Sequence, residues 1–222
     1  MSYTVFLKIK ADTFQQFQDI QQQLNRQESA HLAKALGDVL AEMSCEVIDQ
    51  VFGQMSRDLD DDAESEKVLE QIKEAVKKYM PWSVSFLANE RLIPMVNYLA
   101  DMTYTENGEN LLCYKVDNVI VKETLGCLEQ IRAGNYIYIP LVFKAFTQIV
   151  DQGVTHLVRE PKKLLKFNFV VDKTLNGVIN FTTQLGYRRL EKLANKFDAE
   201  TTEQYFCHFF AFMQPTQLQN EA

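Results

Sequence analysis

Along most of this chain, apolar residues recur at intervals of three and four, which is the spacing of amphipathic helices. The first residues differ, because the apolar residues of 3–9 occupy alternating positions and predict a short strand. A helix that Asp12 can cap is expected next. Its apolar face is formed by Phe14, Phe17, Ile20 and Leu24.

Two longer patterns predict helices of about thirty residues each. They run from Gln27 to about Arg57 and from about Phe167 to Phe197. Shorter helices are expected from the acidic run to Met80, over 83–102, over 109–133, and over 200–213. Pro81, just before the segment 83–102, and Pro94, inside it, are expected to interrupt or kink the helix there.

Turn signals are few but clear. The segment TENGEN at 105–110 predicts a turn. Gly134 is placed to end the helix predicted over 109–133. Pro140 is expected to open a helix that Gly153 closes, although the β-branched and aromatic residues there leave a strand open. Only eight glycines and five prolines occur in 222 residues, which favours long helices over a turn-rich β fold.

We therefore predict an all-α, single-domain helical bundle of about seven or eight helices. No repeat, linker or change in composition divides the chain, so the domain is expected to span residues 1–213. The polar residues 214–222 are expected to form a flexible tail.

Composition points to a cytoplasmic protein. Hydrophobic residues make up 46% of the chain and charged residues 24%, which are ordinary values for a globular domain. The N-terminal apolar run is too short for a signal peptide, and no apolar stretch is long enough to cross a bilayer. The four cysteines have no short paired spacing, so free thiols are expected.

Six acidic residues between Asp58 and Glu66 raise the question of a metal site. As a calcium loop the run lacks the sixth-position glycine and the twelfth-position glutamate, so a helix cap with Asp61 and Glu64 in a capping box is the favoured interpretation. A metal-dependent all-α hydrolase using Glu46, Asp49, Asp61 and Glu64 is kept as a second alternative. No metal ligand or cofactor is assigned.

Other catalytic motifs are absent from the sequence. Neither a phosphate-binding loop nor a dinucleotide fingerprint occurs. Glu28 and His31 form a single Glu-x-x-His step, whereas di-iron bundles use two. Cys207 and His208 are adjacent, so on a helix their side chains diverge and do not make a catalytic pair. An enzyme is therefore the less favoured class.

Two segments are candidates for binding. The C-terminal stretch YFCHFFAFM is apolar on nearly every face, which predicts a core helix or, alternatively, one wall of a ligand pocket formed by Phe206, Phe209 and Phe210. Residues 159–196 hold nine basic and three acidic residues, a net charge of +6 in a chain of net charge −7. Partner-binding residues are predicted there: Lys162, Lys163, Lys166, Arg188, Arg189 and Lys192.

These observations favour a non-enzymatic protein that acts through protein–protein interaction and self-associates as a homo-oligomer. The alternative is a carrier or sensor for a hydrophobic ligand. The basic segment also suits an anionic surface, including a membrane through KKLLKFNFVV, whereas no specific nucleic-acid motif occurs.

Overall fold

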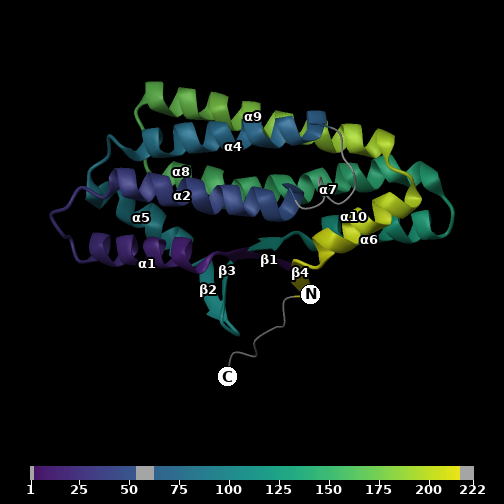
Figure 1. Cartoon of the computed structure of the whole chain (residues 1–222), viewed down its shortest axis with the longest axis horizontal. Coiled ribbons are helices and arrows are strands. Elements are labelled where there is room, and N and C mark those ends of the chain that lie inside the picture. Colours follow the sequence, from purple (N-terminus) through teal and green to yellow (C-terminus); the bar gives the residue numbers. More distant parts are fainter. Residues whose placement is uncertain (1–2, 54–62, 216–222) are drawn as a thin grey trace.

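The computed structural model describes the backbone of residues 3–53 and 63–215 and the side chains of 3–53 and 66–215. The chain is mostly helical and also contains a small four-stranded sheet (Figure 1). The elements follow in the order β1 (Tyr3–Ile9), α1 (Ala11–Asn25), α2 (Ala33–Ile48), the π-helix η1 (Asp49–Gly53), α4 (Ala63–Val84), α5 (Asn89–Ala100), β2 (Thr103–Glu106), β3 (Glu109–Val116), α6 (Asn118–Arg132), η2 (Tyr136–Tyr138), α7 (Ile139–Val154), the π-helix η3 (Thr155–Arg159), α8 (Glu160–Leu164), α9 (Phe169–Lys196), α10 (Ala199–Phe210) and β4 (Met213–Pro215).

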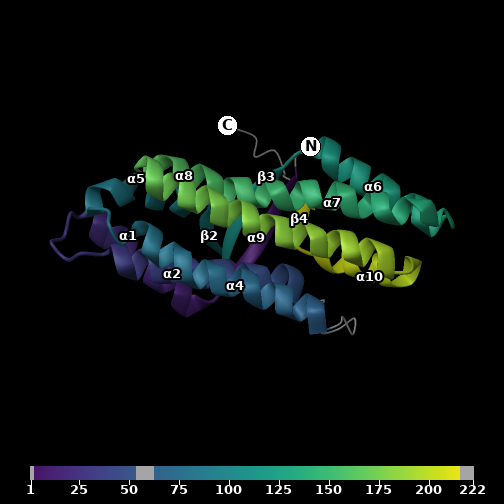
Figure 2. The same cartoon turned by 90° about the horizontal axis from the view of Figure 1, so that it is seen from above.

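The helices lie in layers along the long axis of the molecule. Helices α4 and α9 form an outer layer, and α2 and α7 lie directly beneath them (Figure 1). The sheet and helices α1, α5, α6 and α10 lie on the opposite side of α2 and α7 (Figure 1). Seen from above, α9 runs between the α4 side of the molecule and the α7 side (Figure 2). Helix α9 therefore covers the seam between these two sides.

The sheet is entirely antiparallel and has the strand order β2-β3-β1-β4. Strands β1 and β3 are central, with Tyr3 paired to Val116 and Ile9 to Asn110. Both outer strands are short, with four residues in β2 and three in β4.

Two apolar clusters meet at this sheet. One contains Val5, Leu7 and Tyr114 together with residues of α6, α7, α9 and α10. The other contains Ile9 and Leu112 together with residues of α1, α2 and α5. Because the central strands contribute to both clusters, they join the two halves of the core.

The expectation of an all-α fold is corrected by this sheet. Residues 109–116 form strand β3, and helix α6 begins only at Asn118, where the Asp117 carboxylate accepts a hydrogen bond from the Val119 N–H at 2.7 Å. The helix prediction arose because Leu112, Val116 and Val119 recur at intervals of four and three and continue into α6. The predicted turn is confirmed: Asn107 and Gly108 both have positive φ, as a tight hairpin requires.

The first long helix is also corrected. Helix α2 begins at Ala33 rather than Gln27, because Gln27 adopts φ 55° and the following loop is held from another helix. Asn89 donates to the Ala30 carbonyl at 2.7 Å and accepts from the Leu32 N–H at 3.1 Å. The two longest described helices are instead α4, with 22 residues, and α9, with 28, the latter as predicted to within two residues at each end.

Smaller differences concern helix ends. Lys10 rather than Asp12 is the N-cap residue of α1, and α4 continues through Pro81 to Val84. Gly153 does not end α7, because the chain continues helically through η3 into α8. Gly153 instead permits close packing, since a Cβ atom there would lie 2.8 Å from the Tyr114 hydroxyl oxygen.

Some predictions concern residues or side chains that the structure does not describe. The acidic run Asp58–Asp62 and the Asp61–Glu64 capping box lie outside the described residues and side chains, as do residues 216–222 of the expected tail. Gln214 and Pro215 of that tail belong to β4, which pairs with β1. The single-domain boundary stays a prediction.

Helices α2 and α4 cross so closely that Gly37 has no space for a side chain. A Cβ atom at Gly37 would lie 2.4 Å from Cα of Pro81 and 2.9 Å from Cγ2 of Val84. We expect Gly37→Ala to lower the free energy of unfolding in urea by about 1–3 kcal/mol through overpacking. The control Gly126→Ala, in open space within α6, should instead raise it by about 0.5 kcal/mol. Equal effects of the two variants would contradict the close crossing.

Candidate functional site: an apolar cavity beneath helices α4 and α9

A cavity of about 300 Å³ lies between the outer helices and the sheet. Its floor is formed by Leu7 of β1 and by Leu112 and Tyr114 of β3. The remaining apolar lining comes mainly from four helices: Leu40, Met43 and Val47 of α2; Leu69, Ile72, Val76 and Met80 of α4; Val150 and Val154 of α7; Leu175, Val178, Ile179 and Leu190 of α9.

The roof of the cavity is more accessible than its floor. The lining residues Leu7, Leu112 and Tyr114 are buried, whereas Ile72, Val76, Val178 and Ile179 are only half-buried. These half-buried side chains belong to α4 and α9, which contact each other along the outer layer. Access from outside is therefore expected between α4 and α9.

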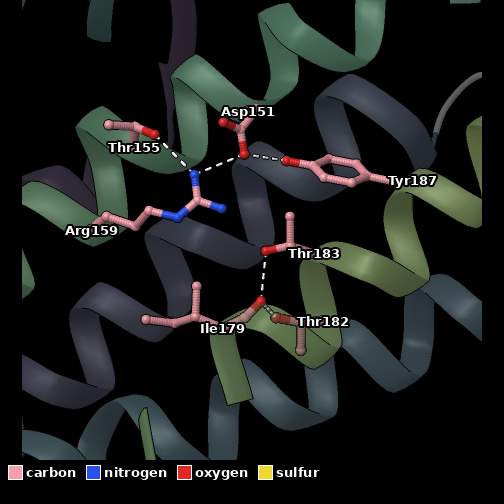
Figure 3. Close-up of polar contacts among 7 residues, drawn as sticks. All are labelled: Asp151, Thr155, Arg159, Ile179, Thr182, Thr183 and Tyr187. Carbon is pink, nitrogen blue, oxygen red and sulfur yellow. Dashed lines mark hydrogen bonds and ion pairs between the residues drawn. The ribbon is translucent and has the colours of Figure 1, made fainter. Parts of the chain in front are cut away.

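Hydroxyl groups in the lining bond to their own helices. Ser44 donates to the Leu40 carbonyl at 2.8 Å and Ser83 to the Met80 carbonyl at 2.7 Å. Thr182 and Thr183 both donate to the Ile179 carbonyl, at 3.1 and 2.6 Å (Figure 3). Because these donors are occupied, they leave few hydrogen-bonding groups for a molecule inside the cavity.

A polar cluster ties α9 to α7 beside the cavity, and we call Asp151, Arg159 and Tyr187 the Asp151 clamp (Figure 3). The Asp151 carboxylate accepts a hydrogen bond from the Tyr187 hydroxyl and one from the Arg159 guanidinium, the latter at 2.7 Å. Arg159 also donates to the Thr155 hydroxyl at 2.9 Å. Tyr187 is the member of the clamp that lines the cavity.

The clamp shifts the acidity of its members. Burial alone raises the pKa of Asp151, but the hydrogen bonds from Tyr187 and Arg159, together with the Arg159 charge, outweigh burial and lower it. Burial and the Asp151 carboxylate raise the pKa of the Tyr187 hydroxyl. At neutral pH the clamp therefore holds an ionised carboxylate between a neutral phenol and a cation.

A second polar contact ties α9 to α8. Lys162 makes an ion pair with Asp172 and donates to the Asn176 side-chain oxygen at 2.9 Å. The hydrogen bond from Lys162 lowers the pKa of Asp172. Lys162 also lines the cavity, so its charge at the cavity edge is matched by a carboxylate of the protein itself.

The predicted pocket residues are only partly brought to this cavity. Phe209 lines it, whereas Phe206 and Phe210 are not among the lining residues. Phe206 and Phe209 are instead buried against Phe146, with ring centroids 5.3 and 4.3 Å away. The interpretation of the C-terminal segment as a core helix is confirmed by this packing.

The predicted partner-binding residues do not share one surface. Arg189 is buried and lines the cavity, and Lys162 is largely buried in its ion pair. The four exposed members are Lys163, which pairs with Glu160 at 2.6 Å, Lys166, Arg188 and Lys192. A partner could reach these four exposed residues. That any of the six contacts a partner stays a prediction.

Of the four acidic residues considered for a metal site, Asp61 and the Glu64 side chain lie outside the described part of the chain, and Glu46 and Asp49 have structural contacts. Glu46 accepts hydrogen bonds from the Lys10 N–H at 2.9 Å and from the Thr13 hydroxyl at 2.6 Å, and so caps the first turn of α1. Asp49 pairs with Lys73 at 3.0 Å. Within residues 3–53 and 63–215, no group of three or more His, Cys, Asp or Glu side chains gathers as a metal site would require. The four cysteines are free thiols, as predicted.

Comparisons with protein-family models, with curated proteins and with solved structures give no match for this chain. In the part of the chain that the structure describes, no helix combines the length and apolar character needed to span a membrane.

Sequence reasoning missed the cavity and the clamp. Asp151 and Tyr187 are 36 residues apart and belong to different helices, so no local pattern relates them. One signal was present: Gly177 and Gly186 in the middle of α9 reduce its side-chain volume, and Gly186 is among the lining residues.

The clamp predicts a pH-dependent contribution to stability. Tyr187→Phe removes one hydrogen bond to the Asp151 carboxylate, so the pKa of Asp151 should rise, as NMR of the labelled carboxyl carbon would show. A carboxyl group with a lowered pKa stabilises the fold above its ordinary pKa, and this contribution is lost as pH falls through the folded-state value. Near pH 7 we expect Tyr187→Phe to lose about 1 kcal/mol, and the loss should shrink in acid. The exposed Tyr136→Phe should change neither quantity.

The capping contacts of Glu46 predict a larger loss of stability than the loss expected for Tyr187→Phe. Glu46→Ala leaves the Lys10 N–H and the buried Thr13 hydroxyl without their acceptor. We expect a loss of about 2–3 kcal/mol in urea unfolding, because hydrogen bonds to a charged group are the stronger kind. The exposed Glu42→Ala on the same helix should stay within about 0.5 kcal/mol of the parent. A similar loss in both variants would remove the case for the cap.

Proposed function

We propose that this protein is a carrier or sensor that binds one small hydrophobic ligand in the cavity beneath α4 and α9. The observation that carries the proposal is a cavity of about 300 Å³ with almost entirely apolar walls. This volume lies at the lower end of the range of small-molecule sites.

Energetics support an occupied cavity. Water is held poorly there, because the hydroxyl groups of Ser44, Ser83, Thr182 and Thr183 are already bonded to backbone carbonyls. Access is expected between α4 and α9, so an apolar guest would cover wall surface that is otherwise exposed to solvent. Burial of apolar surface contributes about 25 cal/mol per Å².

The chemistry of the walls limits the ligand. A guest would contact Leu, Ile, Val and Met side chains on most of its surface, so an aliphatic or alicyclic body fits best. The Lys162 charge is matched by Asp172, and the Tyr187 hydroxyl is bonded to Asp151. The buried Arg189 guanidinium also lines the cavity, so a positively charged ligand body is disfavoured in the interior.

The alternative, a non-enzymatic protein that acts through protein–protein interaction and self-associates, stays a prediction beside the proposed carrier or sensor. Native mass spectrometry separates the two, because a co-purifying small molecule supports the carrier and a clean dimer supports the interaction module. The spectrum should be recorded on protein purified without detergent, so that an apolar guest is retained.

Ligand binding should respond to the volume of the cavity. Gly186 lines the cavity and has open space around its missing Cβ atom, so Gly186→Leu would place a side chain inside. We expect at least a tenfold weaker affinity for an apolar fluorescent probe such as a polyene fatty alcohol, since one side chain of this size is worth about 1.5–3 kcal/mol of burial.

The matched control lies on the same helix. Gly177 of α9 also has open space at its Cβ position but is exposed and does not line the cavity. Gly177→Leu should bind the probe as the parent does, and should share any cost in stability that comes from the helix itself. If Gly186→Leu and Gly177→Leu bind equally, or if the parent binds no apolar probe, the proposed function is wrong.

A further inference from the structure

The turn between α8 and α9 exposes apolar side chains that the core does not use. Phe169 is 78% exposed and Val170 71%, and Leu164 just before the turn is 37% exposed. Phe86, two residues beyond the C-terminal end of α4, is 68% exposed. This end of α4 and the first turn of α9 lie at the same end of the molecule (Figure 1). The two segments that carry these side chains therefore lie at the same end of the outer layer.

Lysines accompany these apolar residues. Lys166 and Lys173 are exposed, and neither makes an ion pair with the residues that the structure describes. We call Leu164, Lys166, Phe169, Val170 and Lys173 the corner surface. The two acidic residues of this segment are already matched, Glu160 by Lys163 and Asp172 by Lys162. The corner surface is therefore locally positive on a chain whose formal net charge is −7.

The backbone beneath the corner surface is held in place. The Arg91 guanidinium donates to the Leu165 carbonyl at 2.6 Å and to the Lys166 carbonyl at 2.7 Å. Lys166 itself has φ 47°, a left-handed backbone conformation, in the segment between α8 and α9. The Asn168 side chain caps α9 by accepting from the Val171 N–H at 3.0 Å. Little conformational entropy remains to be lost in this backbone when the surface docks.

We infer that the corner surface docks on an anionic lipid bilayer. Exposed Phe and Val side chains beside lysines suit the boundary between headgroups and acyl chains, where apolar groups enter and cations meet lipid phosphates. The acidic remainder of the chain does not prevent this, because screening limits its repulsion to about 8–10 Å at physiological salt.

A second copy of the chain fits this surface less well. A two-fold interface places the same patch against itself, so lysines of the corner surface would face lysines of the partner copy without matching acids. A bilayer of anionic lipids supplies the opposite charge over the whole area. Charge complementarity therefore favours the membrane.

The test is flotation of the full chain with vesicles. We expect co-flotation with phosphatidylglycerol–phosphatidylcholine vesicles, little with phosphatidylcholine alone, and release at high salt. Lys166→Glu with Lys173→Glu should lower the partition coefficient at least about tenfold, since each lysine near an anionic surface contributes about a fivefold effect. Phe169→Ser with Val170→Ser should also weaken binding at least about tenfold by removing the inserted apolar groups.

The matched control uses another exposed apolar pair. Tyr136 and Ile137 are 60% and 78% exposed, between α6 and α7 at the opposite end of the molecule. Tyr136→Ser with Ile137→Ser should bind anionic vesicles as the parent does. Circular dichroism verifies that each variant is folded. If a variant of the corner surface does not fold, Lys166→Ala with Lys173→Ala is used in its place.

Three results would overturn the inference: no flotation with anionic vesicles, equal flotation with neutral vesicles, or full binding by both corner variants. A dimer in sedimentation that the corner variants dissociate would assign the surface to a second copy instead. Docking is independent of the cavity, so Gly186→Leu should float as the parent does. Failure of the ligand proposal and failure of the docking proposal are thereby distinguished.

Discussion

The pairing of β1 with β3 is the interaction on which the rest of this structure depends. It joins residues 3–9 to residues 110–116 and so brings the start of the chain to its middle. The two strands supply apolar residues to both core clusters. They also form the floor of the cavity through Leu7, Leu112 and Tyr114. Without this pairing, α2 and α7 would lack the common base on which the outer helices rest.

Helix α9 shows how one element serves two environments. Its ends are anchored: Leu175 is buried near the start, and Leu190 and Leu193 are buried near the end. Its middle is held by the Asp151 clamp and carries small or half-buried residues over the cavity. Polar contacts of Asp172 and Tyr187 thus flank the half-buried apolar residues of α9 that cover the cavity.

The sequence predicted what depends on local periodicity. Helices α1 and α9 were placed to within about two residues because their apolar residues recur at helical spacing. The first strand was recognised because the apolar residues of 3–9 occupy alternating positions in the sequence. Strand β3 was mistaken for helix because its apolar residues also fit a three-and-four spacing that continues into α6. The start of α2 was missed because Asn89, from a distant helix, determines the loop before it. The cavity and clamp arise from packing between helices, which no local pattern encodes.

The short outer strands of the sheet have a consequence for how molecules of this protein meet. Strand β2 offers four residues and ends in Glu106, whereas β4 offers three and ends in Pro215, which has no N–H to donate. A neighbouring chain would find too few aligned backbone groups on the described edges to extend the sheet into a fibre. Contacts between copies are thus steered away from strand addition and toward helical faces.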